Sequence, residues 1–255
     1  MGNNIHLLIN IVVHSFLYVS IIVFVLGMWH QIEDIASTPN PLVIPQNPQS
    51  SEMCGVIGRM AGDLFIFKSL SKGDRFLWIS GLIFHWTFAF LMGFHLFGLL
   101  SYLSDKADYI KISPEIMGFL SLIASIIGFI FIISLILLMI KRINDKKSEY
   151  YSQFFDYFVI MLIFLIGVTG IFMKISPFSP DLSAVKNFMI GAFTLHFRSV
   201  PLNIFFIIHI TLVSILLMVF PFTKLIHAAG FFFSPTRNMP NNPRVIRHIN
   251  IWDKD

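Results

Sequence analysis

Residues 76–103 read FLWISGLIFHWTFAFLMGFHLFGLLSYL and contain no Asp, Glu, Lys or Arg. A helix needs about 20 consecutive, mainly apolar residues to cross a membrane, and this stretch is long enough. His85 and His95 interrupt it. An imidazole surrounded by hydrocarbon loses its water and needs a partner, such as a metal, a proton relay or a ligand. The stretch therefore predicts a membrane-spanning helix that carries two functional histidines.

Other stretches of the chain have the same apolar character. The predicted spanning helices cover about 5–29, 76–103, 116–140, 157–175 and 201–226. The composition agrees, because 56% of the 255 residues are hydrophobic and only 13% are charged, whereas soluble domains carry about 25% charged residues. We therefore predict an all-α integral membrane protein. Residues 1–230 would form a five-helix bundle, and residues 231–255 a polar cytoplasmic tail.

The basic residues predict how the bundle is oriented, since Lys and Arg concentrate in cytoplasmic loops. Thirteen of the 18 Lys and Arg residues lie in the first loop, the third loop and the C-terminal part, and five lie in the opposite loops. This distribution places the N-terminus outside and the C-terminus in the cytoplasm, in a multi-pass protein of the inner (cytoplasmic) membrane. The net charge of +4 thus reflects topology and does not indicate a nucleic-acid partner. The N-terminus lacks a signal-peptide pattern, so we expect the first helix to be retained.

The predicted cytoplasmic loop at about 30–75 has two parts. Its prolines favour an extended polyproline II conformation, and the residues that follow them are amphipathic enough for a short interfacial helix. The loop could be a solvated connector or a docking surface for a cytoplasmic partner.

A second pair of histidines, His209 and His227, lies in and just after the fifth predicted helix. If the helix is continuous, a rise of about 1.5 Å and a turn of about 100° per residue put these two about 27 Å apart on nearly one face. His85 and His95 are about 15 Å apart by the same rule. The second and fifth helices run in opposite directions. Antiparallel packing therefore pairs His95 with His209 toward the outside, and His85 with His227 toward the cytoplasm.

Two imidazole pairs at two depths predict two hemes. Two histidines fill both axial positions of the iron, so such hemes carry electrons instead of binding oxygen. Cys54 is the single cysteine, which excludes covalent CxxCH attachment and an iron–sulfur cluster supplied by this chain alone. Both hemes would be of the b type. The predicted cofactor and iron ligands are the four histidines of the two pairs: His85, His95, His209 and His227.

Two glycines and two further histidines could contribute to these sites. Gly93 and Gly98 flank His95 and leave room for a flat macrocycle or a neighbouring helix. His14 lies well inside the first predicted helix. We expect it to form a hydrogen bond between helices, with a quinone carbonyl or a heme propionate as the alternative partner. We expect His196 to be a solvated loop residue, with contact to a quinone headgroup as the alternative.

The stretches FHWTFAFLMGFHLFGLL, which contains His85 and His95, and FPFTKLIH, which ends at His227, resemble the gamma subunit of respiratory nitrate reductase. His209 stands at the matching distance upstream. That subunit is a five-helix diheme cytochrome b. The resemblance implies that the four histidines are axial heme ligands, with the pairing given above.

The first loop is longer than in that family, and the tail FFFSPTRNMPNNPRVIRHINIW resembles the membrane cytochrome b subunit of the sulfite-reduction-associated (Dsr) complex. This second resemblance implies menaquinol as an exchangeable substrate and a role in sulfur-compound reduction. It also implies a cytoplasmic iron–sulfur partner that resembles the catalytic subunit of heterodisulfide reductase, with further membrane and periplasmic cytochrome subunits. Electrons would pass from menaquinol to the outer heme, then to the inner heme and the partner.

Other functions stay open at the level of sequence. One is the gamma subunit of a nitrate reductase itself. A histidine-relay transporter would need carboxylates inside the membrane or inverted repeats, and the spans contain neither. A heme-free membrane anchor is the third. We predict no catalytic residue and no substrate chemistry in this chain, which would serve as an electron-transfer subunit of a quinol-oxidising complex.

Overall fold

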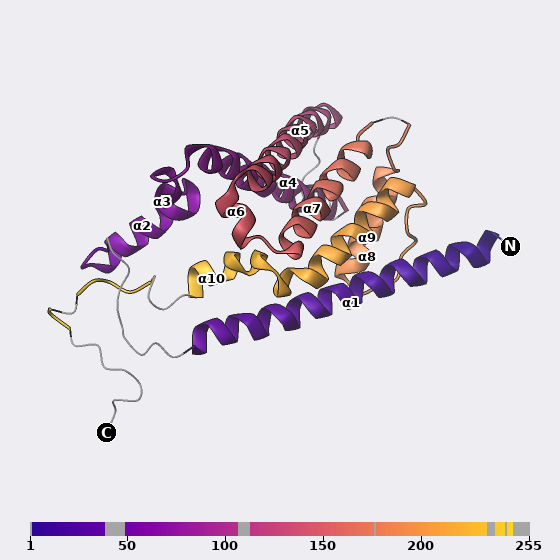
Figure 1. Cartoon of the computed structure of the whole chain (residues 1–255). Helices are drawn as coiled ribbons and strands as arrows, with labels where there is room; N and C mark the ends of the chain where they lie inside the picture. The colour runs from indigo at the N-terminus through magenta and orange to yellow at the C-terminus, as the bar shows by residue number, and fades with distance from the viewer. Residues whose placement is uncertain are drawn as a thin grey trace, which may run out of the picture. The chain divides into compact units, whose positions relative to one another are not determined.

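A computed structural model describes residues 2–38, 49–106, 113–175, 177–233, 238–242 and 244–246. Helices make up the regular structure of this part of the chain, which contains no strand (Figure 1). They are α1 (Gly2–Ser37), α2 (Met53–Phe65), α3 (Lys68–Ser71), α4 (Arg75–Lys106), α5 (Pro114–Asn144), α6 (Lys146–Tyr151), α7 (Phe154–Phe172), α8 (Leu182–Phe193), α9 (Ile204–Val219) and α10 (His227–Phe233). The loop prolines, for which an extended conformation is predicted, lie outside the described residues. So does most of the predicted tail.

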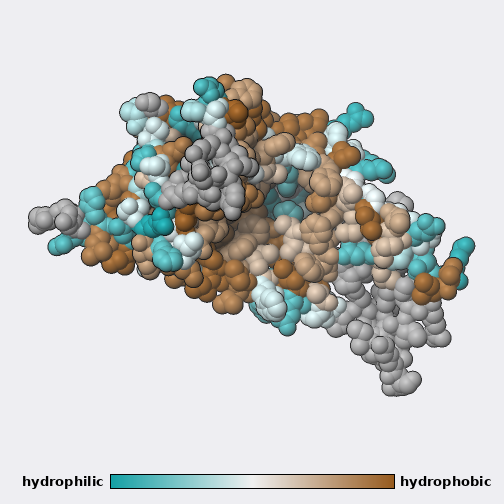
Figure 2. All heavy atoms as spheres, turned by 180° about the vertical axis from the view of Figure 1, so that it is seen from behind, coloured by the Kyte–Doolittle hydropathy of each residue, from teal (hydrophilic) through white to brown (hydrophobic). Residues whose placement is uncertain are grey.

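Five helices are long and apolar enough to cross a membrane, which confirms the predicted all-α class and the predicted number of spans. They cover Asn4–Ser37, Arg75–Ser101, Pro114–Asn144, Phe154–Phe172 and Ile204–Phe222. Their large apolar side chains are mostly exposed: Leu26 is 64% and Phe119 is 63% accessible. Figure 2 shows hydrophobic residues forming broad areas on one face. Apolar surface of this extent is typical of contact with lipid.

The described residues divide into two units, and each is described here by itself. The first consists of Met1–Val23 and Ile79–Val219, and the second of Phe24–Trp78 and Phe220–Asp255. The first unit therefore contains most of α4 and all of α5 to α9, together with the N-terminal part of α1.

In the first unit, α7 packs between α5 and α9. Gly128 of α5 allows a close approach to α7, because a Cβ at this position would lie 2.6 Å from Cδ1 of Ile171. On the other side of α7, the rings of Phe172 and Phe205 stack with centroids 4.9 Å apart. Glycine and aromatic contacts of this kind hold helices together in a membrane, where the hydrophobic effect between helices is absent.

One ion pair joins α5 to α7 at the end of the unit near α6. Arg142 lies 3.2 Å from Asp156, whose side chain is 7% exposed. Asp156 also completes a capping box with Gln153 at the start of α7. Arg142 is therefore paired with a carboxylate of its own chain.

One buried cluster of the first unit lies where α1, α8 and α9 meet. Its most buried members are Val13, Leu17, Phe188, Val200, Phe206 and Ile210. Helix α8 is absent from the predicted helices. Asp181 caps it by accepting a hydrogen bond from the Ser183 amide, and the Ser183 donors hold the pKa of the Asp181 carboxyl below its ordinary value.

The C-terminal end of α8 turns back on itself. Leu195 adopts φ 58, and the amide of His196 donates to the Gly191 carbonyl at 2.9 Å. This is the Schellman arrangement, in which a residue in the left-handed conformation ends a helix. The position usually holds glycine, so Leu195 is strained there. The turn directs residues 196–199 back along α8 toward α1.

The predicted continuous helix at about 201–226 is interrupted. Helix α9 ends at Val219, and two 3-10 turns, η1 (Phe220–Phe222) and η2 (Lys224–Ile226), precede α10. Pro221 explains the break, because proline lacks the amide donor and its ring clashes with the preceding helical turn. The spacing of about 27 Å calculated for an unbroken helix therefore does not apply to His209 and His227.

The second unit contains the short helix expected in the first loop. Helix α2 buries Val56, while Met53, Ile57 and Phe65 are exposed. Arg59 pairs with Asp63 at 3.2 Å, and the Trp78 indole donates to the Ile66 carbonyl at 2.7 Å. The helix is thus amphipathic, as predicted.

Candidate functional site

Three of the four predicted iron ligands use the same internal hydrogen bond. The Nδ1 atoms of His85, His95 and His227 lie 2.7 Å from the carbonyl oxygens of Gly81, Leu91 and Lys224, respectively. A carbonyl only accepts, so each Nδ1 carries the proton and donates. Such a bond fixes the orientation of a histidine and raises the basicity of its Nε2, which is how ligating histidines are usually held.

His209 is held differently, by a residue of another helix. Its Nδ1 lies 3.0 Å from the Thr169 hydroxyl of α7. The hydroxyl is also within 2.9 Å of the Leu165 carbonyl and 3.0 Å of the Ile166 carbonyl. Its single proton is directed to these carbonyls, so the arrangement makes Thr169 the acceptor of the His209 Nδ1–H. The imidazole then presents Nε2 to a ligand.

The first unit brings His95 of α4 and His209 of α9 close enough to interact electrostatically. Gly93 and Gly98 flank His95 in the chain and leave open space beside α4, whereas Gly170 of α7 lies against the His209 ring. A Cβ at Gly93 or Gly98 would meet nothing within 4 Å, and one at Gly170 would lie 3.5 Å from Cε1 of His209. Helix α4 also contacts α5, where the rings of Phe84 and Phe131 stack with centroids 5.6 Å apart.

These residues fit a bis-imidazole heme. Each ring has Nδ1 engaged by the protein, and His95 is exposed although it lies within a span. An imidazole exposed to hydrocarbon is costly unless something binds it. Among the described residues, no three His, Cys, Asp or Glu side chains gather as a metal site, and heme requires only two axial side chains.

The other predicted pair is divided between the units. His85 belongs to the first unit and His227 to the second. Their pairing stays a prediction.

The remaining histidines differ from the four. His14 is buried and donates from Nδ1 to the Asn10 carbonyl of its own helix at 2.8 Å, so the expected bond between helices is wrong for this nitrogen. His196 is exposed and bonds to the Thr194 carbonyl at 2.7 Å, in agreement with a loop residue. His30 lies 3.8 Å from Asp34.

Residues 49–248 match the family described as nitrate reductase gamma subunit. The chain belongs to this family. The matched range includes all four histidines predicted to bind heme, and it begins after the described part of α1. The resemblance to this family seen in the sequence is therefore confirmed, and helix α1 lies outside the range that matches the family.

Two curated relatives share most of their length with this member of the nitrate reductase gamma subunit family. Both are named "Hdr-like menaquinol oxidoreductase cytochrome b-like subunit". The protein of Archaeoglobus fulgidus is 30% identical over 92% of this chain and 81% of its own length. The protein of Archaeoglobus profundus is 28% identical over the same shares. No solved structure matches the chain significantly.

The sequence did not point to Thr169 or Gly170 as parts of the site. Both lie in a span whose helical periodicity marks no position as special, and only the packing of α7 against α9 brings them to His209. A polar residue among apolar ones was the only signal available for Thr169.

Proposed function

We propose that this chain is the diheme cytochrome b subunit of a membrane menaquinol oxidoreductase. It would pass electrons between menaquinol and a cytoplasmic iron–sulfur partner that resembles heterodisulfide reductase. The observation that carries the proposal is that His95 and His209, on two spanning helices of one unit, interact electrostatically and each have Nδ1 engaged by the protein. The names of the two Archaeoglobus relatives support menaquinol and the heterodisulfide-reductase-like assembly over nitrate reduction.

The proposed ligands divide into an outer pair, His95 and His209, and an inner pair, His85 and His227. When bound, heme iron would supply one-electron transfer. The protein's part is to orient the imidazoles through their Nδ1 bonds and to surround them with apolar side chains. Both effects adjust the affinity and reduction potential of the metal.

The proposed partner surfaces follow from the topology. The loop at about 30–75, which includes α2, and the C-terminal tail would face the cytoplasm and meet the iron–sulfur subunit. The opposite face would adjoin the membrane and periplasmic cytochrome subunits. The reduction of sulfur compounds would belong to the partners and not to this chain.

Optical spectroscopy of the purified protein tests the proposal. The reduced-minus-oxidised spectrum should show a b-type α band, and pyridine hemochrome analysis should give about two hemes per chain. His95→Ala and His209→Ala should lose the same heme, and His85→Ala and His227→Ala the other. His30→Ala is the control and should retain both. A folded, heme-free protein would contradict the proposal and favour a relay or an anchor.

A further inference from the structure

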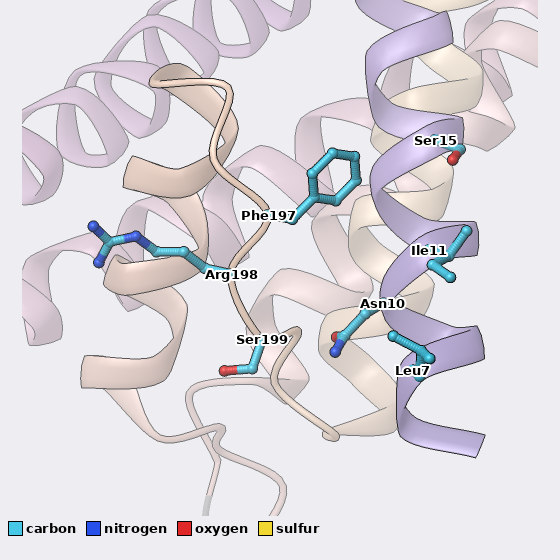
Figure 3. A pocket seen from close by; sticks show the side chains of 7 residues that line it. All are labelled: Leu7, Asn10, Ile11, Ser15, Phe197, Arg198 and Ser199. Carbon is cyan, nitrogen blue, oxygen red and sulfur yellow. The ribbon is translucent and has the colours of Figure 1, made fainter. Parts of the chain in front are cut away.

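A cavity of about 380 Å³ lies in the first unit, between α1 and the segment that joins α8 to α9. Its lining residues are Leu7, Asn10, Ile11, Ser15, Phe197, Arg198 and Ser199. Figure 3 shows the Phe197 ring turned toward α1 and the Arg198 side chain turned away from it. The volume falls within the range of about 300–1,000 Å³ typical of small-molecule sites. Leu7 and Ile11 are 59% and 49% exposed, so a lipid-soluble molecule can reach the cavity from the membrane.

Next to this cavity, His14 carries a nitrogen that lacks a partner. The residue is 0% exposed, and Nδ1 donates to the Asn10 carbonyl at 2.8 Å. The proton on Nδ1 leaves Nε2 as an acceptor, and within the described part of the chain nothing donates to it. A buried polar atom without a partner costs about 1–3 kcal/mol, and a missing ligand or water is the usual explanation.

Phe197 connects the unpartnered nitrogen to the cavity. It lines the cavity, and its ring centroid lies 5.1 Å from that of His14. The side chain is 67% exposed, so few atoms oppose its rotation. The backbone beside it is fixed, since the Val200 amide donates to Oδ1 of Asn10 at 2.7 Å. Rotation of the Phe197 ring would thus open His14 to the cavity without moving the loop.

A short path of aromatic rings leads from His14 to the helix of His209. The Phe188 ring lies 5.0 Å from the His14 ring and 5.3 Å from the Phe206 ring. Phe206 precedes His209 by three residues on α9, which puts the two on neighbouring positions of one helix face. Successive ring contacts therefore link the cavity to the helix that carries His209, within the same unit.

We propose that this cavity binds the ring of a quinol and that Nε2 of His14 accepts the proton of a quinol hydroxyl. The inference rests on the proposed function and adds the place where quinol is oxidised. The quinol breaks two O–H bonds and becomes a quinone, releasing two protons and two electrons. His14 takes the protons in turn and passes each to water at the mouth of the cavity. The electrons would go one at a time to the heme that His95 and His209 are proposed to hold, which would be the oxidant of this step.

The polar groups around the cavity suit this role. The Asn10 carbonyl, which accepts from Nδ1, would stabilise the imidazolium formed when Nε2 takes a proton. The Ser15 and Ser199 hydroxyls at the cavity offer polar contacts for the second quinol oxygen. The apolar residues that line the cavity, Leu7, Ile11 and Phe197, would contact the ring.

Binding of a quinol analogue tests the location. We would use the full chain with its hemes in nanodiscs, and measure the quenching of 2-heptyl-4-hydroxyquinoline N-oxide fluorescence. Ile11→Trp fills the cavity and should weaken binding about tenfold or more, whereas the control Val12→Trp should change it less than about twofold. Val12 is the next residue, is 57% exposed and does not line the cavity. Unchanged affinity in Ile11→Trp would overturn the site.

Heme reduction tests the role of His14. His14→Gln keeps an acceptor but removes the base, so analogue binding should persist while reduction by a naphthoquinol slows about 100-fold. Dithionite should reduce the hemes normally in this variant, which also reports that it is folded. An unchanged naphthoquinol rate would overturn the role of His14, and if this variant does not fold, Ile11→Trp decides alone. Wild-type hemes that respond to dithionite but not to naphthoquinol would instead refute the proposed function, and with it this inference.

Discussion

The Thr169 hydroxyl orients a histidine that is 40 residues away in the sequence. It accepts from Nδ1 of His209 across the interface between α7 and α9, while the other three proposed ligands use carbonyls of their own chain segment. A carbonyl cannot be removed by substitution, but a hydroxyl can. Of the four proposed ligands, His209 is therefore the one whose Nδ1 hydrogen bond can be removed by a substitution.

We expect Thr169→Val to weaken the outer heme and leave the inner one in place. Valine has nearly the same shape but cannot accept, so the His209 Nδ1–H loses the hydroxyl that orients it. Loss of such an outer contact typically lowers metal affinity about 10- to 100-fold. Heme content and the midpoint potential of each heme, measured by redox titration, would show the change.

Thr211→Val is the control for this experiment. Thr211 also bonds to a carbonyl of its helix, at 2.7 Å from Ile207, and lies about 200° around α9 from His209. Both hemes should keep their wild-type potentials in this variant. If Thr169→Val leaves the outer heme unaltered, the hydroxyl has no part in orienting the ligand.

At this scale, the sequence identified the histidines but not their supports. A histidine inside an apolar stretch is visible because hydrocarbon makes its polarity costly. Thr169 and Gly170 are not visible in this way, since threonine and glycine occur throughout membrane helices for packing reasons. Their role arises from a contact between positions 40 residues apart.

Among the elements, α8 determines where the cavity beside α1 can exist. Its C-terminal turn directs residues 196–199 back toward α1, and Gly191 makes the turn possible. A Cβ at Gly191 would lie 2.6 Å from the His196 carbonyl oxygen, a backbone atom that cannot move aside.

We expect Gly191→Ala to destabilise the protein and Leu195→Gly to be neutral or stabilising. The first substitution forces a clash with backbone, which typically costs about 1–3 kcal/mol. The second removes the strain of the left-handed backbone at position 195, which costs about 1–2 kcal/mol when the residue has a side chain such as that of leucine. Thermal denaturation in detergent, followed by heme release, should show a lower midpoint for Gly191→Ala.

Gly118→Ala provides the matched control, because a Cβ there meets nothing within 4 Å. Its midpoint should stay the same or rise, since alanine is favoured over glycine within a helix. A Gly191→Ala variant as stable as Gly118→Ala would show that the turn adapts, and the cavity would then not depend on it.

The sequence contained the signals for two element features that the predictions missed. In α8, Asp181 is a standard capping residue, and Val185, Phe188 and Ala192 follow at helical spacing. The helix is shorter than a membrane span, so a search for long apolar stretches does not find it. Pro221 likewise predicts the end of α9, but the apolar run continues through it, and hydropathy does not register a break.

For the whole molecule, the number of spans and the helical class follow from composition, because a membrane admits few alternatives to apolar helices. The pairing of His85 with His227 does not follow in the same way. It depends on how the chain continues after Val219, where the helix stops. Spacing along a helix cannot determine a position beyond its end.

The orientation in the membrane is a molecular property that this chain allows one to test with its natural cysteine. Cys54 is a free, exposed residue of α2, in the loop proposed to be cytoplasmic. A membrane-impermeant maleimide should label it in inverted vesicles and not in right-side-out ones. The physical reason is the excess of Lys and Arg on that side, which resists translocation.

A relocated cysteine gives the converse measurement. Ser179 is exposed between α7 and α8, on the side opposite to Cys54 in a five-span topology. The double variant Cys54→Ser, Ser179→Cys should therefore be labelled in right-side-out vesicles alone. The reverse labelling pattern in both proteins would show that the bundle has the opposite orientation in the membrane. His95, His209 and the cavity beside α1 would then face the cytoplasm, and protons from quinol would be released inside the cell instead of outside.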